Sequence, residues 1–147
     1  MTGPGGGMAT VLYVDDQEAI CRAVRLWLSR KGHVVHLAAT AQAARKVISA
    51  EPLDGIFIDL LLGAESGLEL YRWIDELDAD LAQRVAFVTG NLFDETLAAE
   101  RLDRRVFAKP FELRELEALA NRWYAERQPH RDDRNTGQGA DRAQPGR

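Results

Sequence analysis

The chain has 147 residues, of which 46% are hydrophobic and 29% are charged, so one globular domain is the simplest expectation. Its formal net charge of −4 at pH 7 argues against a broadly basic protein that coats nucleic acid. The single cysteine, Cys21, excludes an internal disulfide, and no apolar run approaches the roughly 18 residues of a membrane-spanning helix.

The first eight residues, 1–8, are rich in glycine and precede every predicted strand. They lack the basic and apolar regions of a secretory signal peptide. No glycine-rich phosphate-binding motif follows a strand anywhere in the chain, so nucleotide binding has no support. We therefore expect a flexible leader at this end and a cytoplasmic protein without membrane attachment.

Short apolar runs alternate along the chain with segments whose apolar residues recur at helical spacing. The predicted strands are 10–14, 34–37, 55–59, 85–88 and 105–108. The predicted helices are 20–28, 41–50, 70–77, 94–102 and 113–123. Because strands that alternate with helices imply crossover connections, the sheet should be parallel, with helices on both faces. The prediction is a doubly wound α/β domain over 9–126.

The composition changes sharply from Arg127 onward. This segment is rich in Arg, Asp, Gln, Gly and Pro, and it has no aliphatic residue larger than alanine. Such a segment cannot bury enough apolar surface to offset the entropy lost on ordering. We expect a disordered polar tail over 127–147, with nucleic-acid contact as the less favoured alternative.

Polar side chains stand at the carboxyl ends of four of the five predicted strands. Asp15 and Asp16 follow the first strand, and Asp59 ends the third. Thr89 ends the fourth strand and Lys109 follows the fifth. The carboxyl ends of parallel strands form the rim at which open α/β sheets bind ligands. We therefore expect these five side chains to meet in one place.

The three aspartates of this rim need a cation. Two carboxylates about 4 Å apart repel by roughly 4 kcal/mol at an effective dielectric constant near 20, and Lys109 alone does not balance three of them. Mg²⁺ prefers such oxygen ligands and leaves positions for phosphate oxygens. Zinc would require His or Cys as well, and His33 and His36 have opposite parity on one strand. The rim therefore predicts a magnesium site.

A carboxylate held beside a metal ion can attack phosphorus, because aspartyl-phosphate intermediates form in this way. Lys109 and the hydroxyl of Thr89 are placed to stabilise the oxygens of the incoming group. The rim therefore indicates a site that carries a phosphoryl group on Asp59.

These residues resemble the receiver domains of two-component response regulators, and the resemblance covers nearly all of residues 9–126. It rests on Val14-Asp15-Asp16, Asp59-Leu60-Leu61-Leu62 with Gly67, Thr89-Gly90, and Lys109-Pro110-Phe111, in this order and at family-like separations. The resemblance implies a flavodoxin-like sheet of order 2-1-3-4-5. It also implies that Asp59 is the phosphoacceptor and that the donor is a phosphohistidine on a sensor histidine kinase or a histidine phosphotransfer protein.

The resemblance further implies a role for each rim residue. Asp16 and Asp59 would ligate Mg²⁺ directly, together with the backbone carbonyl of Leu61, and Asp15 would act mostly through metal-bound water. Thr89 would move toward the phosphoryl oxygens on phosphorylation, and Lys109 would pair with them. The domain would assist its own phosphorylation and dephosphorylation without being an enzyme for other substrates.

Two positions depart from the family pattern. Gly63 stands where the family often has proline, and Val106 stands where a switch tyrosine or phenylalanine is common. The usual coupling between the threonine and the aromatic residue is therefore not expected. The form Val106-Phe107-Ala108-Lys109 is closer to receivers attached to hybrid kinases, so a receiver excised from a larger kinase stays an alternative.

The function expected from these features is a phosphorylation-dependent signalling switch. The segment after residue 126 is too short for a DNA-binding or enzymatic output domain, so we expect output through protein–protein contacts, from a monomer or weak homodimer. The candidate surface comprises the helix 94–102, the fifth strand and the final helix, including Arg104, Arg105, Val106 and the exposed side of 112–126.

Two other functions stay open at this point. One is a metal-dependent phosphatase with an aspartyl nucleophile. Such enzymes commonly have Asp-x-Asp after the first strand, whereas Gln17 follows two adjacent aspartates here. The other is a receiver-shaped interaction module that is never phosphorylated, which the departures at Gly63 and Val106 leave possible.

Overall fold

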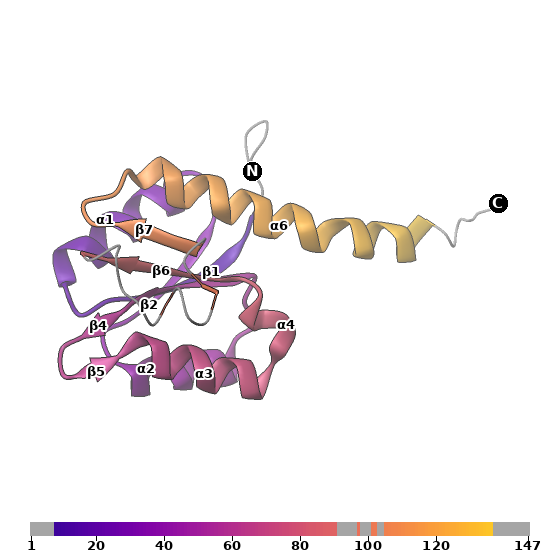
Figure 1. Ribbon diagram of the computed structural model, residues 1–147. Coiled ribbons are helices and arrows are strands. Elements are labelled where there is room, and N and C mark those ends of the chain that lie inside the picture. Colours follow the sequence, from indigo (N-terminus) through magenta and orange to yellow (C-terminus); the bar gives the residue numbers. More distant parts are fainter. Residues whose placement is uncertain (1–7, 91–96, 98–100, 103–104, 137–147) are drawn as a thin grey trace.

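A computed structural model describes residues 8–90, 97, 101, 102 and 105–136. Its centre is a five-stranded parallel sheet of order β2-β1-β3-β6-β7 (Figure 1). The strands are β1 Thr10–Val14, β2 Val34–Ala38, β3 Gly55–Asp59, β6 Val85–Thr89 and β7 Val106–Ala108. In the numbering of the five sheet strands this order is 2-1-3-4-5, so the predicted doubly wound topology is confirmed.

Helices cover both faces of the sheet, as expected for crossover connections. They are α1 Glu18–Arg30, α2 Ala41–Ala50, α3 Gly67–Leu77, α4 Ala79–Ala82 and α6 Leu113–Thr136. α1 and α6 lie on one face, and α2 and α3 lie on the other (Figure 1). The helix predicted over 94–102 falls mostly outside the described residues, although Leu97 is helical and buried.

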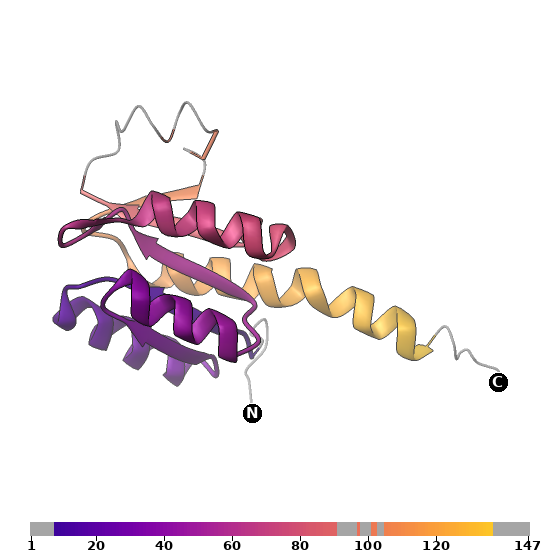
Figure 2. The same ribbon diagram turned by 90° about the horizontal axis from the view of Figure 1, so that it is seen from below.

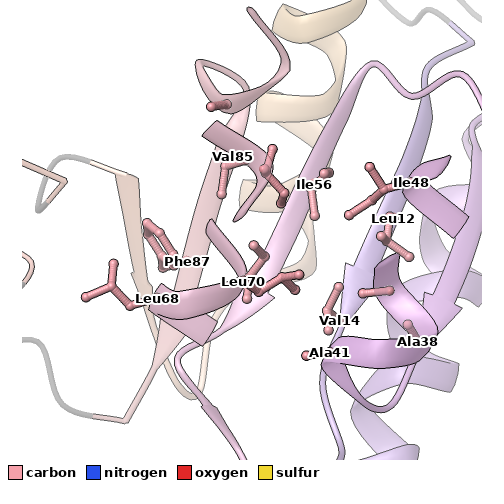
Figure 3. Packing of buried hydrophobic residues seen from close by; sticks show 14 of the residues in the cluster. Leu12, Val14, Ala38, Ala41, Ile48, Ile56, Leu68, Leu70, Val85 and Phe87 are labelled. Carbon is pink, nitrogen blue, oxygen red and sulfur yellow. The ribbon is translucent and has the colours of Figure 1, made fainter. Parts of the chain in front are cut away.

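The two faces of the sheet form two separate hydrophobic cores. Because side chains alternate along a strand, Leu12 of β1 and Ile56 of β3 point toward α2 and α3, where Ile48 and Leu70 pack on them (Figure 3). Phe57, the next residue after Ile56 on β3, points to the opposite face and packs on Trp123 of α6. Asp59 and Thr89 end β3 and β6, and Asp15 and Lys109 directly follow β1 and β7, so polar residues gather at the carboxyl ends of these four strands.

Short elements that the sequence did not predict complete the connections. β4 Leu61–Leu62 and β5 Glu65–Ser66 form a small antiparallel pair directly after β3. Its turn contains Gly63, whose φ of 61° is a left-handed conformation that glycine adopts at no steric cost. The side chain of Ser66 then caps α3 by accepting hydrogen bonds from two backbone N–H groups. β4 and β5 have two residues each, too few for a recognisable pattern of apolar residues in the sequence.

The last helix is longer than the sequence predicts. A disordered tail was expected from residue 127, whereas α6 continues to Thr136. Arg127 fixes the helix to the domain, because its Nη1 donates to the carbonyl oxygen of Leu53 at 3.0 Å and to Oδ1 of Asp54 at 2.8 Å. Once a helix is docked in this way, each further residue adds a hydrogen bond without a new nucleation step, so low hydrophobicity does not end it. The leader 1–7 and the segment 137–147 lie outside the described residues.

Among the helices in the described part of the chain, none combines the length and the apolar character needed to cross a bilayer.

Candidate functional site

The carboxyl ends of β1, β3, β6 and β7 surround one pocket with a volume of about 450 Å³. The pocket is lined by Asp16, Gln17, Asp59, Leu61, Gly63, Thr89, Gly90 and Lys109. The structure therefore brings together the polar strand ends that the sequence places at one rim. The fifth of them, Asp15, lies directly behind the pocket, where it contacts Lys109.

Asp59 is the last residue of β3, and only 5% of its surface is exposed. Its Oδ1 accepts a hydrogen bond from the backbone N–H of Leu61 at 3.0 Å, and its Oδ2 accepts one from Nζ of Lys109 at 2.8 Å. Burial raises the pKa of Asp59, and these two hydrogen bonds oppose the rise without cancelling it. The carboxylate is thus poorly solvated and held in a fixed orientation.

Lys109 provides the positive charge of the site. Its Nζ lies 2.8 Å from Oδ2 of Asp59, 3.1 Å from Oδ2 of Asp15 and 2.6 Å from Oε1 of Gln17. Burial alone would lower the pKa of Lys109, but the hydrogen bonds and charges of the two aspartates outweigh burial and raise it. The ammonium group therefore stays charged at neutral pH. Its backbone N–H donates to the carbonyl oxygen of Thr89 at 2.8 Å, which ties β7 to β6 at the rim.

The two aspartates after β1 differ in environment. Asp15 is fully buried and accepts hydrogen bonds from the hydroxyl of Tyr13 at 2.8 Å and from the backbone N–H of Gln17 at 2.9 Å. Burial, and then the charge of Asp15, raises the pKa of Tyr13, so the phenol remains a neutral donor. Asp16 is exposed and lines the pocket. Asp15 is therefore committed to protein partners, while Asp16 faces the space that a ligand would enter.

The three carboxylates form a cluster suited to a hard cation. Asp15, Asp16 and Asp59 each offer one oxygen, and these oxygens lie within 4.8 Å of one another. Oxygen donors alone fit Mg²⁺ better than Zn²⁺. His33 is not available as a ligand here, because it is buried beside β2 and its Nδ1 accepts a hydrogen bond from the N–H of Ala9.

Thr89 and Leu61 complete the pocket from two further elements. Thr89 ends β6 and is 7% exposed, and it lines the pocket beside Gly90. Leu61 follows Asp59 by two residues, and 71% of the surface of this residue is exposed. Its N–H is bonded to Asp59, so the backbone at Leu61 is held against the carboxylate cluster.

Residues 11–121 match the response regulator receiver domain family. The chain belongs to this family. Receiver domains are signalling domains of two-component systems, and the sheet order and the position of the pocket in this chain agree with that assignment.

Two curated relatives and one solved structure illustrate the likeness of this receiver domain. It is 32% identical over 114 residues to the DNA-binding transcriptional regulator NtrC of Azospirillum brasilense, covering 78% of this chain and 24% of that protein. It is 31% identical over 113 residues to the response regulator receiver protein CpdR of Brucella abortus, covering 74% of this chain and 91% of that protein. A Burkholderia pseudomallei response regulator, solved with a phosphorylated aspartic acid, a calcium ion and citrate, superimposes with a TM-score of 0.67 at 28% identity, covering 84% of this chain and 72% of that one.

The chain spans only 24% to 46% of the length of the first curated relatives that it matches.

The two departures from the receiver pattern have structural counterparts. Proline fixes φ near −65°, so it could not adopt the left-handed backbone that Gly63 has here. The turn after Asp59 in this receiver domain therefore differs from one built on proline. Val106 is half-buried on β7 and packs against the core on the α2 and α3 face of the sheet.

Sequence reasoning missed two polar contacts of the site. Tyr13 reads as an ordinary apolar strand residue, and only the structure shows its hydroxyl on Asp15. In the sequence, Gln17 stands out only as the residue after two adjacent aspartates, whereas in the structure its Oε1 accepts a hydrogen bond from Nζ of Lys109. Its position directly after Asp16, before the first turn of α1, is the one sequence signal that could have placed it at the rim.

Proposed function

We propose that Asp59 accepts a phosphoryl group from a phosphohistidine on a sensor histidine kinase or a histidine phosphotransfer protein, and that phosphorylation shifts the domain between two conformations. The observation that carries this proposal is the position of the Asp59 carboxylate. It stands at the tip of a central strand, 2.8 Å from Nζ of Lys109 and beside two further aspartates.

The chemistry follows from what each group can do. A carboxylate oxygen of Asp59 attacks phosphorus, while the bond from phosphorus to the donor nitrogen breaks. Negative charge on the three peripheral oxygens is stabilised by the ammonium group of Lys109 and by the hydroxyl of Thr89. Mg²⁺, held directly by Asp16, Asp59 and the carbonyl of Leu61 and through water by Asp15, would neutralise further charge on these oxygens.

The solved Burkholderia relative supports this assignment, because its aspartic acid is phosphorylated in the presence of a divalent cation. The assignment to a signalling family also favours a switch over an enzyme that hydrolyses small phosphate esters. The intact aspartate cluster favours phosphorylation over a purely structural receiver module. We further propose a cytoplasmic location and a monomeric or weakly dimeric state.

Output would pass through protein–protein contacts on the surface formed by β7 and α6. Arg105 and Val106 lie there, half-buried, at the edge of the sheet. Arg105 is anchored, because its Nη1 donates to the carbonyl oxygen of Ala82 at 2.9 Å. β7 also ends next to Lys109, so a change at the phosphoryl group can reach this surface through one short strand. Arg104 and most of the helix predicted over 94–102 lie outside the described residues.

The test is phosphorylation by acetyl phosphate in the presence of Mg²⁺, followed by intact-mass analysis. We expect one added phosphoryl group on the wild type and none on Asp59→Asn. Asp75→Asn is the matched control, because Asp75 is exposed on α3 and does not line the pocket, and it should be labelled like the wild type. Labelling that survives in Asp59→Asn would reject the assignment. Continuous release of phosphate from a small ester would support the phosphatase alternative instead.

A further inference from the structure

Gln17 makes the shortest of the contacts to the ammonium group of Lys109. Nζ lies 2.6 Å from Oε1 of Gln17, compared with 2.8 Å from Asp59 and 3.1 Å from Asp15. A lysine ammonium has three N–H donors and no acceptor. Among the described residues, Gln17 and Asp59 accept hydrogen bonds from this ammonium group and Asp15 forms an ion pair with it, so three oxygen atoms compete for its three donors.

A phosphoryl oxygen can bind Lys109 only if one of these acceptors gives up its hydrogen bond. Asp15 is fully buried, and Asp59 is nearly so, and a buried carboxylate that loses a donor bears a large desolvation penalty. Gln17 is neutral and exposed, so water can replace Lys109 as its partner at little cost. Gln17 is thus the acceptor that exchanges most easily.

The surroundings of Gln17 leave its side chain room to move. Besides lining the phosphoacceptor pocket, Gln17 borders a second cavity of about 530 Å³. That cavity lies between α1 and the segment after β7, and its walls include Ile20, Phe111 and Leu113. Lys109 also borders both spaces, so the contact between Gln17 and Lys109 forms part of the wall between them.

We propose that Gln17 is a positioning residue that competes with the phosphoryl group for Lys109 and thereby sets how fast Asp59 is phosphorylated. This inference rests on the proposed function. With acetyl phosphate as donor, the bond from phosphorus to the acetate oxygen breaks, the bond to Asp59 forms, and acetate leaves. During this transfer one N–H of Lys109 moves from Oε1 of Gln17 to a phosphoryl oxygen, and the amide of Gln17 turns to water.

Two substitutions of Gln17 should act in opposite directions. Gln17→Met keeps the length of the side chain and removes the acceptor oxygen, so Lys109 has a free donor and phosphorylation should be roughly 2- to 10-fold faster. Gln17→Glu keeps the shape and adds a charge that binds Lys109 more strongly, so phosphorylation should be slower by a similar factor. A merely structural role for Gln17 would slow both variants.

The experiment measures the phosphorylation rate with acetyl phosphate and Mg²⁺ by intact mass, and the affinity for beryllofluoride, a phosphoryl mimic, by calorimetry. We expect tighter beryllofluoride binding for Gln17→Met and weaker binding for Gln17→Glu. Glu18→Met is the matched control, because the neighbouring Glu18 pairs with Arg22 and does not line the pocket, and it should behave like the wild type. Urea unfolding verifies that each variant folds, with Gln17→Ala as the replacement should Gln17→Met not fold.

The outcomes separate this inference from the proposed function. If the wild type is not phosphorylated at Asp59, the proposed function fails and the inference fails with it. If the wild type is phosphorylated but Gln17→Met is unchanged or slower, only the inference is overturned. Faster Gln17→Met together with slower Gln17→Glu supports it.

Discussion

Gly67 lies directly against Asp59, because a Cβ atom at position 67 would overlap the backbone carbonyl oxygen of Asp59 and would stand 2.8 Å from Cγ2 of Ile58. The first residue of α3 thus touches the strand that carries the central carboxylate. The backbone N–H of Gly67 also donates to the carbonyl oxygen of Leu60 at 2.9 Å. The first residue of α3 is therefore in direct backbone contact with the end of β3.

We expect Gly67→Ala to lower the free energy of unfolding by about 1 to 3 kcal/mol, since the overlap is with backbone that cannot rotate away. Urea denaturation would measure the loss. Gly90→Ala is the matched control, because a Cβ atom at Gly90 would have no neighbour within 4 Å among the described residues. Equal stability of the two variants would contradict the packing argument.

The buried charge of Asp59 should cost stability when no metal is bound. Burial raises the pKa of Asp59 above its ordinary value of about 4, so the folded state favours the protonated form. That contribution to stability is present at low pH and is lost as the pH rises through the folded pKa. We expect Asp59→Asn to be more stable than the wild type at pH 7 by about 1 kcal/mol in the presence of EDTA.

The gap between Asp59→Asn and the wild type should narrow as the pH falls toward 4, and it should also narrow when Mg²⁺ is added. Urea unfolding at several pH values, with and without Mg²⁺, gives both comparisons. A less stable Asp59→Asn at neutral pH without metal would show that the hydrogen bonds from Lys109 and Leu61 outweigh burial.

Substitutions of Asp15 and Asp16 should differ in their effects on the stability of the fold and on Mg²⁺ binding. Asp16 is exposed, so Asp16→Ala should weaken Mg²⁺ binding by about tenfold or more and leave stability nearly unchanged. Asp15→Ala should weaken Mg²⁺ binding less but destabilise the fold by about 2 kcal/mol, because Tyr13 and Gln17 lose a buried acceptor. Calorimetric titration with Mg²⁺ and urea unfolding measure the two effects. Equal or reversed effects on Mg²⁺ affinity would mean that the two roles are misassigned.

His33 should make the stability depend on pH below neutrality. It is buried, and its Nδ1 accepts a hydrogen bond from the N–H of Ala9 at 3.0 Å. Burial lowers the pKa of His33, and this outweighs the raising effects of Asn121, Glu117 and Asp54. The unfolded chain therefore binds the proton first, so stability is fully present above about pH 6.5 and is lost as the pH falls toward the folded pKa.

The measurement is the free energy of unfolding between pH 5 and 7.5. His33→Asn places an amide oxygen near the position of Nδ1 without a titrating group, so its stability should fall less than that of the wild type at the acidic end. His36→Gln, three residues later on β2, is the control and should follow the wild type. A wild type and His33→Asn that change in parallel would exclude His33 as the source.

The parallel sheet and the rim were accessible from the sequence because each depends on a local signal, whereas the order of the strands was implied only by the resemblance to receiver domains. Apolar runs such as Gly55–Asp59 identify strands by themselves, and the polar residues at the ends of four of the five runs mark the rim. Thr89 and Lys109 could be placed there once the strands were known to be parallel. None of these predictions required knowledge of which residue each side chain contacts.

Other features depend on the direction of a single side chain or on contacts between distant segments. Neither produces a periodic pattern in the sequence. The hydrogen bond from the Tyr13 hydroxyl to Asp15 depends on the inward direction of the Tyr13 side chain. The hydrogen bond between Gln17 and Lys109 joins two residues that are 92 positions apart in the chain. Hydrophobicity also gives no signal for the length of α6, because Arg127 contacts the domain through hydrogen bonds to Leu53 and Asp54.

α6 has a mechanical consequence. Its 24 residues form a rod of roughly 36 Å at 1.5 Å per residue. Leu116, Ala120 and Trp123 attach its first half to the sheet, and its later turns extend beyond the body of the domain (Figure 2). A tilt of about 5° at the attached half would therefore displace the far end, roughly 18 Å away, by about 1.6 Å. Any repacking beneath the attached half would therefore be carried along the helix to a point outside the body of the domain.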